Sequence, residues 1–396
     1  MSAESANDML VVNAGSSSIK LVLFNAQEKP KQFIEGIIEN IGQPTAQFVI
    51  NGPTATEKTQ KPIDVQDHQT AIELLLRWLK EQTTNSKISI IGHRIVHGGP
   101  KYFRPSIIDD EMLSELRNLV IFDQEHLPAQ IKLVESLRQL FPGIRQVACF
   151  DTAFHHDLPN VAKLLTIPRH YESKGLRRYG FHGLSYEFVV QELKRLNEPN
   201  AAEGCLIIAH LGSGASLAAV HKGKSIDTTM GLTPTSGVPM STRSGDLDPG
   251  IFSYLAQSEG LDAGKINEIV NKQSGLLGIS GKTSDMKQLL EQEDSDDLAK
   301  DAVDLFCYQI KKSIGSLAAA MGRLETLVFT GGMGENAPKI RARICNGLEF
   351  LGIKIDETRN VANDRLISTQ ESQVTILVIH TDEALMIAQN VQRFID

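Results

Sequence analysis

The alternation of apolar and polar positions along this chain predicts strands and helices in turn. Near the N-terminus, apolar runs at residues 10–12 and 21–24 flank a stretch of glycine, asparagine and serine, which predicts two strands joined by a tight turn. Residues 67–82 carry isoleucine and leucine at helical spacing and predict an amphipathic helix. The same reasoning predicts helices at 109–120 and 129–140, and short buried strands at 88–91 and 146–150. Strands that alternate with helices indicate an α/β fold, in which we expect parallel strands.

The second half of the chain repeats the opening pattern. Residues 206–220 again have an apolar run, a glycine–serine turn and a second apolar run, and Gly212 follows Gly15 at an offset of 197 residues. Such an echo at half the chain length predicts two related domains that face each other across a cleft. A further strand and turn is predicted at 327–336 after a long helix at 301–324, and a last helix at 382–394.

We expect the domain boundary to be a tight crossover near residues 150–155, because no flexible linker separates the halves. The first domain is predicted to span residues 1–152, with the C-terminal helix 385–396 packed on it. The second domain is predicted to span residues 153–384. The helix at 301–324 has a partly apolar surface, which fits either a dimer interface or the core.

Composition narrows the class of protein. The chain has 396 residues, 41% of them hydrophobic, and a net charge of −8, which argues against nucleic acid as a partner. The polar N-terminus predicts no signal peptide, and no apolar run is long enough to span a membrane. Four scattered cysteines, without a CxxC pair, predict reduced packing residues in a cytoplasmic protein; they are Cys149, Cys205, Cys307 and Cys345.

Three glycine-rich turns, each after a predicted strand, could hold a nucleotide between the domains. In the first turn, backbone N–H groups and serine hydroxyls could cradle a phosphate while Lys20 neutralises its charge. In the third, GGMGEN at 331–336, glycine permits close approach of a ligand to the backbone. The alternative in both cases is a turn with only a structural role. Neither a P-loop pattern nor a dinucleotide-binding GxGxxG follows the first strand.

Two arginines in glycine-rich surroundings are candidates for holding anions. Arg94 lies in GHRIVHGG at the end of a predicted strand, and Arg243 lies in MSTRSGDLDPG. A guanidinium pairs bidentately with a carboxylate or a phosphate, so two arginines could hold an anionic substrate and a transferring phosphoryl group together. Each arginine alone could instead form a structural ion pair.

Other polar residues fit the same chemistry. His182, in RRYGFHGLS, could donate a hydrogen bond to a phosphoryl oxygen, or could simply be a buried histidine in a glycine turn. Asp151, in CFDTAFHH, could orient an arginine, and Glu383, at the start of the last helix, could hold Mg²⁺ or only favour the helix dipole. We interpret His97, His155 and His156 as structural.

Taken together, these motifs resemble the acetate kinase family, within the superfamily of acetate and sugar kinases, Hsp70 and actin. The resemblance extends over ten ordered segments: VVNAGSSSIK, GHRIVHGG, FDTAFH, RRYGFHG, HLGSGAS, DTTMGLTP, TRSGDLDP, SGLLGISG, FTGGMGEN and TDEALMIA. It implies two duplicated actin-like ATPase domains of the βββαβαβα type, of which the second binds the nucleotide. It also implies ATP or ADP with Mg²⁺ (or Mn²⁺) in the cleft, and a homodimer. The implied reaction is reversible phosphoryl transfer from ATP to acetate. Alternatives are a kinase of propionate or butyrate, an actin- or Hsp70-like ATPase, and a catalytically dead binding protein.

The resemblance also implies roles for individual residues. The implied catalytic residues are Arg94, Asp151, His182 and Arg243. The implied nucleotide ligands are Asn13, Ser16, Ser18 and Lys20 in the first phosphate segment, His210, Gly212, Ser213 and Gly214 in the second, and Asp285, Met286, Lys287, Gly331, Gly332, Gly334, Glu335 and Asn336 in the adenosine pocket. Val96, Phe181 and Pro234 would line an apolar pocket for the methyl group of the substrate, and Asn13 and Glu383 would hold the metal.

Four positions depart from the family pattern. Ser213 stands where asparagine is usual, but a serine can still donate one hydrogen bond. Lys287 stands where arginine is usual, and lysine lacks the planar group that stacks on a base. In the segment QEHLP at 124–128, Glu125 replaces an apolar pocket residue and Leu127 replaces asparagine. A carboxylate beside an apolar pocket is costly unless it points away or pairs with a cation, so these two positions bear on the choice of acid.

Overall fold

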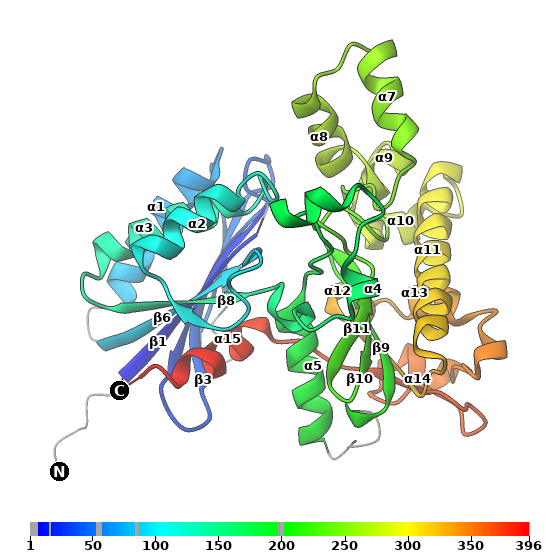
Figure 1. Cartoon of the computed structure of the whole chain (residues 1–396). Helices are drawn as coiled ribbons and strands as arrows, with labels where there is room; N and C mark the ends of the chain where they lie inside the picture. The colour runs from blue at the N-terminus through cyan, green and yellow to red at the C-terminus, as the bar shows by residue number, and fades with distance from the viewer. Residues whose placement is uncertain are drawn as a thin grey trace. The chain divides into compact units, whose positions relative to one another are not determined.

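The chain folds into two compact units, each built around one β-sheet (Figure 1). The computed structural model describes residues 7–15, 17–52, 58–83, 87–196, 198 and 202–395. The first unit contains the chain up to Ala153 and the residues from Asp382 on, and the second unit contains Phe154–Thr381. The chain therefore passes from one unit to the other twice. That the second unit binds the nucleotide stays a prediction.

The sheet of the first unit contains eight described strands in the order β5-β4-β3-β2-β1-β6-β8-β7. Their bounds are β1 Asn7–Ala14, β2 Ile19–Asn25, β3 Lys31–Glu39, β4 Gln47–Asn51, β5 Lys58–Pro62, β6 Lys87–Ile95, β7 Ser106–Ile107 and β8 Arg145–Phe150. The first five strands pair as antiparallel neighbours, and β1, β6 and β8 are parallel. The predicted hairpin at the N-terminus is confirmed as β1 and β2.

The sheet of the second unit contains five described strands in the order β11-β10-β9-β12-β13. Their bounds are β9 Cys205–Leu211, β10 Ala215–His221, β11 Lys224–Thr228, β12 Thr326–Thr330 and β13 Thr375–Val378. As in β3-β2-β1-β6-β8, three antiparallel strands are followed by two parallel ones. This shared order confirms the duplicated α/β fold. The expectation of parallel strands was only half right, because each sheet is mixed.

The helices of the first unit cover its sheet through apolar faces. They are α1 His68–Gln82, α2 Asp110–Leu119, α3 Leu127–Leu140 and α15 Glu383–Gln392. Helix α1 begins where Asp67 accepts a hydrogen bond from the backbone N–H of Thr70 at 2.8 Å, which satisfies one unpaired donor of the first turn. Its buried face includes Leu75 and Trp78, which belong to the same hydrophobic cluster as the strands beneath.

The helices of the second unit are more numerous. Those described are α4 Asn160–Lys163, α5 Gly183–Arg195, α7 Pro249–Ser258, α8 Ala263–Lys272, α9 Gly275–Ser280, α10 Met286–Gln292, α11 Asp297–Met321, α12 Gly331–Asn336, α13 Pro338–Cys345 and α14 Glu357–Val361, with 3-10 turns at Ala153–His155, Arg169–Lys174 and Glu349–Leu351. The long helix α11 packs on β9, β10 and β11 and ends at Gly322, whose φ of 78° is left-handed. The segment GGMGEN, expected to be a turn, is the short helix α12, because Glu335 folds back to accept the backbone N–H of Gly331 at 2.9 Å.

The helix that follows the last strand of each unit along the chain belongs to the other unit. Helix α5 follows the strands of the first unit along the chain but packs on β9, whereas α15, red in Figure 1, follows β13 but packs on β1 and β6.

The four cysteines are buried free thiols, as predicted from their spacing. Among the described residues, no helix combines the length and apolar character needed to cross a membrane.

Candidate active site

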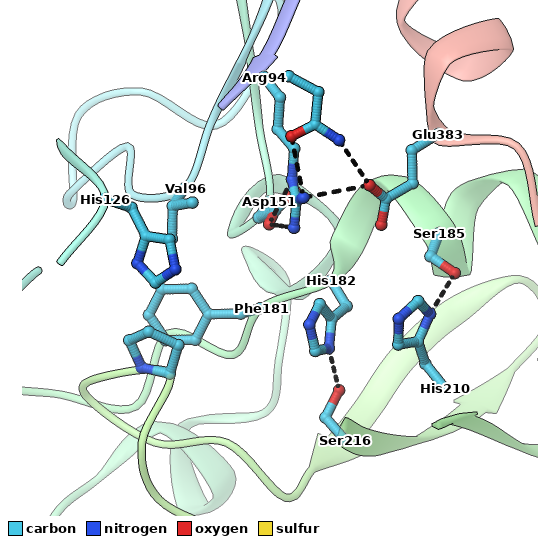
Figure 2. Close-up of polar contacts among 12 residues, drawn as sticks. Arg94, Val96, His126, Asp151, Phe181, His182, Ser185, His210, Ser216 and Glu383 are labelled. Carbon is cyan, nitrogen blue, oxygen red and sulfur yellow. Dashed lines mark hydrogen bonds and ion pairs between the residues drawn. The ribbon is translucent and has the colours of Figure 1, made fainter. Parts of the chain in front are cut away.

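In the first unit, four polar residues meet at the C-terminal edge of the parallel strands. Arg94 lies near the end of β6, and Asp151 directly follows β8, so the parallel pairing of these strands brings the two side chains together. The Nε of Arg94 donates to both carboxylate oxygens of Asp151 at 3.0 Å, and Nη2 donates to Oδ2 at 2.6 Å (Figure 2). Asp151 is 1% exposed, so this bidentate pair is shielded from water.

Asn13 and Glu383 complete this constellation from β1 and from the first turn of α15. Nη1 of Arg94 donates to Oδ1 of Asn13 and contacts Oε2 of Glu383, both at 3.2 Å. The amide of Asn13 also donates to Oε2 of Glu383 at 3.4 Å. Burial disfavours the charged guanidinium, but Asp151 and Glu383 outweigh that cost and raise the pKa of Arg94 above its ordinary value. The arginine is therefore held both in place and in its charged form.

The first glycine-rich turn, between β1 and β2, is closed by a hydrogen bond from the backbone N–H of Gly15 to the carbonyl of Ser18 at 2.8 Å. Gln130 of α3 donates to the carbonyl of Ala14 at 3.0 Å. Ser18 is half-buried, and Ser16 lies outside the described residues. Lys20, opposite Asn13 in the hairpin register, forms an ion pair with Glu35 of β3. Its predicted role at a phosphate stays a prediction, because its ammonium group already has an anionic partner in this structure.

In the second unit, His182 lies at the junction between a glycine turn and α5. Its φ of 58° is left-handed, an uncommon conformation for a residue with a side chain. Its Nδ1 lies 2.8 Å from the hydroxyl of Ser216 on β10 (Figure 2). That hydroxyl also contacts the phenol of Tyr186. His182 is thus buried and oriented from two elements, which fits a histidine with a positioned second nitrogen.

His210 of β9 stacks on His182 with ring centroids 4.4 Å apart. Its Nδ1 lies 2.8 Å from the hydroxyl of Ser185 on α5 (Figure 2). The hydroxyl of Ser185 lies 2.9 Å from that of Thr381. Both histidines are therefore held through Nδ1 by serine hydroxyls. This arrangement leaves Nε2 of each ring directed away from its serine.

The turn after β9 brings Arg243 into the same constellation. A Cβ placed on Gly214 would lie 3.0 Å from Nε2 of His182 and 3.6 Å from Nη1 of Arg243, so only glycine leaves these side chains their space. Nη1 of Arg243 donates to the carbonyl of Pro234 at 3.1 Å. The loop that carries Arg243 is tied to the turn by the hydrogen bond from Ser241 N to Ser213 O, 3.2 Å long.

Helix α12 lies against the same turn. Gly331 has a φ of +77°, and a Cβ there would lie 3.0 Å from the backbone of Leu211, the last residue of β9. Gly334 packs near the carbonyl of Ala209 of β9, and Gly332 has open space where a side chain would stand. Asn336 donates to the carbonyl of Gly332 at 3.0 Å. Two glycine segments far apart in the sequence are therefore neighbours in the second unit.

The remaining predicted residues have simpler surroundings. Asp285 is exposed and caps α10 by accepting the backbone N–H of Lys287 at 2.9 Å, Met286 is buried, and the side chain of Lys287 is exposed. Val96 of the first unit, and Phe181 and Pro234 of the second, are buried within their own units.

The two departures in QEHLP have different consequences. Glu125 is half-buried, and Leu127 is a fully buried residue at the start of α3, where it contributes to a hydrophobic cluster. Leu127 therefore replaces a polar residue at a position that the fold makes apolar.

Several residues of these constellations were missed from the sequence. Ser185, Ser216 and Thr381 orient the two histidines, yet isolated hydroxyl residues carry no sequence signal. Asp123 and His126 form a buried pair in which Oδ1 of Asp123 lies 2.8 Å from Nδ1 of His126. Their spacing of three residues before a helix could have indicated this pair.

An arginine fixed by buried carboxylates, and a second arginine beside two stacked histidines and glycine turns, are typical of enzymes that bind and transfer anionic phosphate groups. The comparisons with known proteins agree. The chain belongs to the acetokinase family, whose model matches residues 8–389.

Named relatives cover nearly the whole chain. An acetate kinase from Rhodopseudomonas palustris (strain TIE-1) is 40% identical over 393 residues, which are 98% of each chain. An acetate kinase from Nitrobacter hamburgensis is 43% identical over 390 residues, covering 97% of this chain and 95% of the relative.

Solved structures agree with this relationship. The structure of an acetate kinase from Porphyromonas gingivalis has 37% sequence identity and a TM-score of 0.84, and the match covers 99% of this chain and 100% of that one. A propionate kinase from Francisella tularensis, also 37% identical, has a TM-score of 0.89, with 97% and 98% of the two chains covered. The predicted family and fold are thereby confirmed.

Proposed function

We propose that this protein is an acetate kinase, which transfers the γ-phosphoryl group of ATP reversibly to acetate and yields acetyl phosphate and ADP. The observation that carries the proposal is that each unit presents one partly buried arginine, Arg94 or Arg243, bound to groups that fix its orientation. The proposal also rests on relatives of about 40% identity that are named acetate kinases.

The chemistry needs little covalent help from the protein. Acetate is ionised near pH 7, so its carboxylate is already a nucleophile and needs no general base. An acetate oxygen attacks the γ-phosphorus, the bond from phosphorus to the β,γ-bridging oxygen breaks, and ADP leaves with that electron pair. The enzyme must bring anions together and stabilise charge on the phosphoryl oxygens, which is positioning and electrostatics. We assign Arg94 and Arg243 as the clamps for the carboxylate and the phosphoryl group.

His182 is proposed to donate a hydrogen bond to the phosphoryl group in the transition state. With the hydroxyl of Ser216 donating to Nδ1, the neutral ring carries its proton on Nε2, the nitrogen nearest Gly214. Asp151 is proposed to act through Arg94, because its bidentate contact fixes the plane of the guanidinium. His210, Gly212 and Ser213 would contact phosphate oxygens beside His182.

The surroundings of Asn13 and Glu383 fit a magnesium ion. They supply an amide oxygen and a carboxylate, the hard oxygen ligands that Mg²⁺ prefers, and both face the same guanidinium. Among the described residues, no cluster of three or more acidic, histidine or cysteine side chains could cage a metal, so the other ligands would be water and nucleotide phosphates. When bound, the ion would neutralise charge on the phosphate oxygens.

The choice of acid is a separate, testable part of the reaction. A propionate kinase is among the similar structures, and Glu125 stands where the family pattern has an apolar pocket residue. Val96, Phe181 and Pro234 remain the residues predicted to contact the methyl group of the acid. The test is trapping of the acyl phosphate with hydroxylamine, with Mg-ATP and acetate, propionate or butyrate in parallel. We expect the highest kcat/KM with acetate. If an acyl phosphate formed only with propionate or butyrate, the protein would be a kinase of that longer acid. ATP hydrolysis without any acyl phosphate would contradict the assignment as a carboxylate kinase.

We further propose that the protein is a cytoplasmic homodimer. Helices α7 and α11 of the second unit carry exposed apolar side chains, and a second copy of the chain would cover them; they are Ile251, Phe252, Tyr254, Leu298, Leu305 and Tyr308. Light scattering after size-exclusion chromatography would give twice the chain mass of 43.5 kDa for a dimer.

A further inference from the structure

A single carboxylate, that of Glu335, joins two segments of the second unit: the start of α12 and residues 380–381. Its Oε1 accepts the backbone N–H of Gly331 at 2.9 Å and that of Thr381 at 3.1 Å. Its Oε2 lies 2.6 Å from Nδ1 of His380, an exposed side chain. Burial opposes ionisation of Glu335, but His380 and the two backbone donors outweigh it and lower its pKa. Both oxygens of the carboxylate are therefore bound to groups of the protein itself.

Each partner of Glu335 has a distinct place in the fold. Gly331 opens the glycine-rich segment that is predicted to hold the nucleotide, and it packs on the backbone of Leu211. Thr381 is the last residue of the second unit before the chain returns to the first, and Glu383 follows two residues later. One oxygen atom thus anchors both the glycine segment and the crossover.

The network continues from Thr381 to the histidines. The hydroxyl of Thr381 lies 2.9 Å from that of Ser185, which lies 2.8 Å from Nδ1 of His210, and His210 stacks on His182. Ser185 is fully buried, so water does not replace these contacts. A shift of Thr381 would therefore disturb both the orientation of His210 and the path of the chain toward Glu383.

The geometry points to Glu335 as a positioning residue that couples nucleotide binding at the glycine segment to the crossover at Thr381 and to the histidine pair. This inference rests on the proposed function, and it gives Glu335 a role different from that of a direct ligand of the adenosine. When a bound nucleotide restricts the motion of Gly331, it also restricts that of Thr381 at the crossover, because one carboxylate binds the backbone N–H groups of both residues.

The chain offers a matched control. Glu325 lies directly before β12, whereas Glu335 lies after it. The Oε2 of Glu325 accepts the backbone N–H of Cys205 at 2.6 Å. Cys205 begins β9, so Glu325 binds the N-terminal end of that strand, whereas Glu335 binds backbone groups after β12 and β13. Replacing either by alanine removes a hydrogen bond from a backbone N–H to a carboxylate, but only Glu335 touches the crossover.

The experiment compares wild type with Glu335→Ala, Glu335→Gln and Glu325→Ala. ADP affinity is measured by calorimetry, kcat and KM for ATP by the acyl phosphate assay, and amide exchange in the peptide around Thr381 with and without ADP. For Glu335→Ala we expect ADP affinity and kcat to fall by roughly tenfold each, because hydrogen bonds to a charged group are lost. We also expect ADP to slow exchange at the crossover in wild type but not in this variant.

The glutamine variant keeps an oxygen for the backbone donors and is expected to recover most of the ADP affinity. Glu325→Ala is expected to lower the thermal midpoint while ADP affinity, kcat and ADP-induced protection stay at wild-type values. The inference would be overturned if Glu335→Ala lost only stability, with ADP affinity and ADP-induced protection from amide exchange unchanged. It would also be overturned if the wild-type protein bound no ADP. Absence of acyl phosphate with ADP-dependent protection intact would contradict the proposed function and leave the coupling supported.

Discussion

At the scale of single residues, the two arginines differ in how they are held. Arg94 is bound by the buried carboxylate of Asp151 through Nε and Nη2, and its Nη1 approaches a second carboxylate. Arg243 donates to the carbonyl of Pro234 and contacts the sulfur of Met240. A fixed planar fork loses little entropy when an anion binds, so lysine would not replace either residue.

Replacing Arg94 or Arg243 by alanine should lower kcat by about 100-fold or more, since each removes a charge that would stabilise the transferring phosphoryl group. The measurement is the acyl phosphate assay at saturating ATP and acid, with circular dichroism to verify folding. Arg104→Ala, at an exposed position of the first unit, is the matched control and should retain wild-type kcat. Turnover near that of wild type in either test variant would rule out the assigned clamp.

At the scale of elements, the contact between α1 and the sheet of the first unit depends on a glycine. Gly36 on β3 lies directly under the indole of Trp78, and a Cβ there would approach three ring atoms to between 2.5 and 2.9 Å. The ring also makes an edge contact with Phe48 of β4, with centroids 5.8 Å apart. The indole therefore has no free space into which it could move without disturbing a neighbour.

Gly36→Ala should destabilise the first unit by about 1–3 kcal/mol, the usual cost of overpacking a core. Trp78 is the only tryptophan in the chain, so its fluorescence during urea unfolding follows this unit. The matched control is Gly315→Ala in α11 of the second unit, where a Cβ meets no atom within 4 Å, so the unfolding midpoint reported by Trp78 should stay at its wild-type value. An unchanged unfolding midpoint in Gly36→Ala would show that the helix moves away freely.

At the scale of the whole molecule, each unit contains a buried histidine that folding keeps neutral. Burial lowers the pKa of His93 in the first unit to about 4, although Gln146 partly opposes this effect. Burial likewise lowers the pKa of His155 in the second unit to about 4, although the carbonyl of Phe181 partly opposes it. In both cases the unfolded chain binds a proton more readily than the folded protein between pH 6.5 and 4.

Folding stability should therefore be retained above pH 6.5 and fall as the pH is lowered toward 4, by about 3 kcal/mol for each histidine. Urea unfolding at several pH values measures this dependence. His155→Gln should show a shallower loss in acid than wild type, because the titrating group is gone. His170→Gln, at an exposed position, should keep the wild-type pH dependence. An identical pH dependence in His155→Gln would contradict this explanation.

The fold was predictable where local signals and periodicity agree. Asp67 before an apolar helical pattern predicted α1 within one residue, and the hairpin of β1 and β2 followed from its turn. The mixed order of each sheet was not predictable, because the direction of a strand depends on partners far away in the sequence. Helix α12 was missed because its glycines favour a turn, while the contact that stabilises it comes from the side chain of Glu335.

The site was predictable as a set of residue types, and the assigned roles stay predictions. The structure brings Arg94, Asp151, Asn13 and Glu383 together, as their shared assignment to a phosphate site would require. It pairs Lys20 with Glu35, a contact that no motif indicated.

By itself, the sequence determined the family, the α/β class, the duplication and the residue types of the reaction, because motifs and periodicity are local properties of the chain. Only the tertiary structure decided which hydroxyls orient the histidines and where the last helix of each repeat packs. The same holds for Glu335, whose carboxylate holds backbone groups 50 residues apart, Gly331 and Thr381. These features depend on packing between segments far apart in the chain, and local sequence patterns do not specify the distances between such side chains.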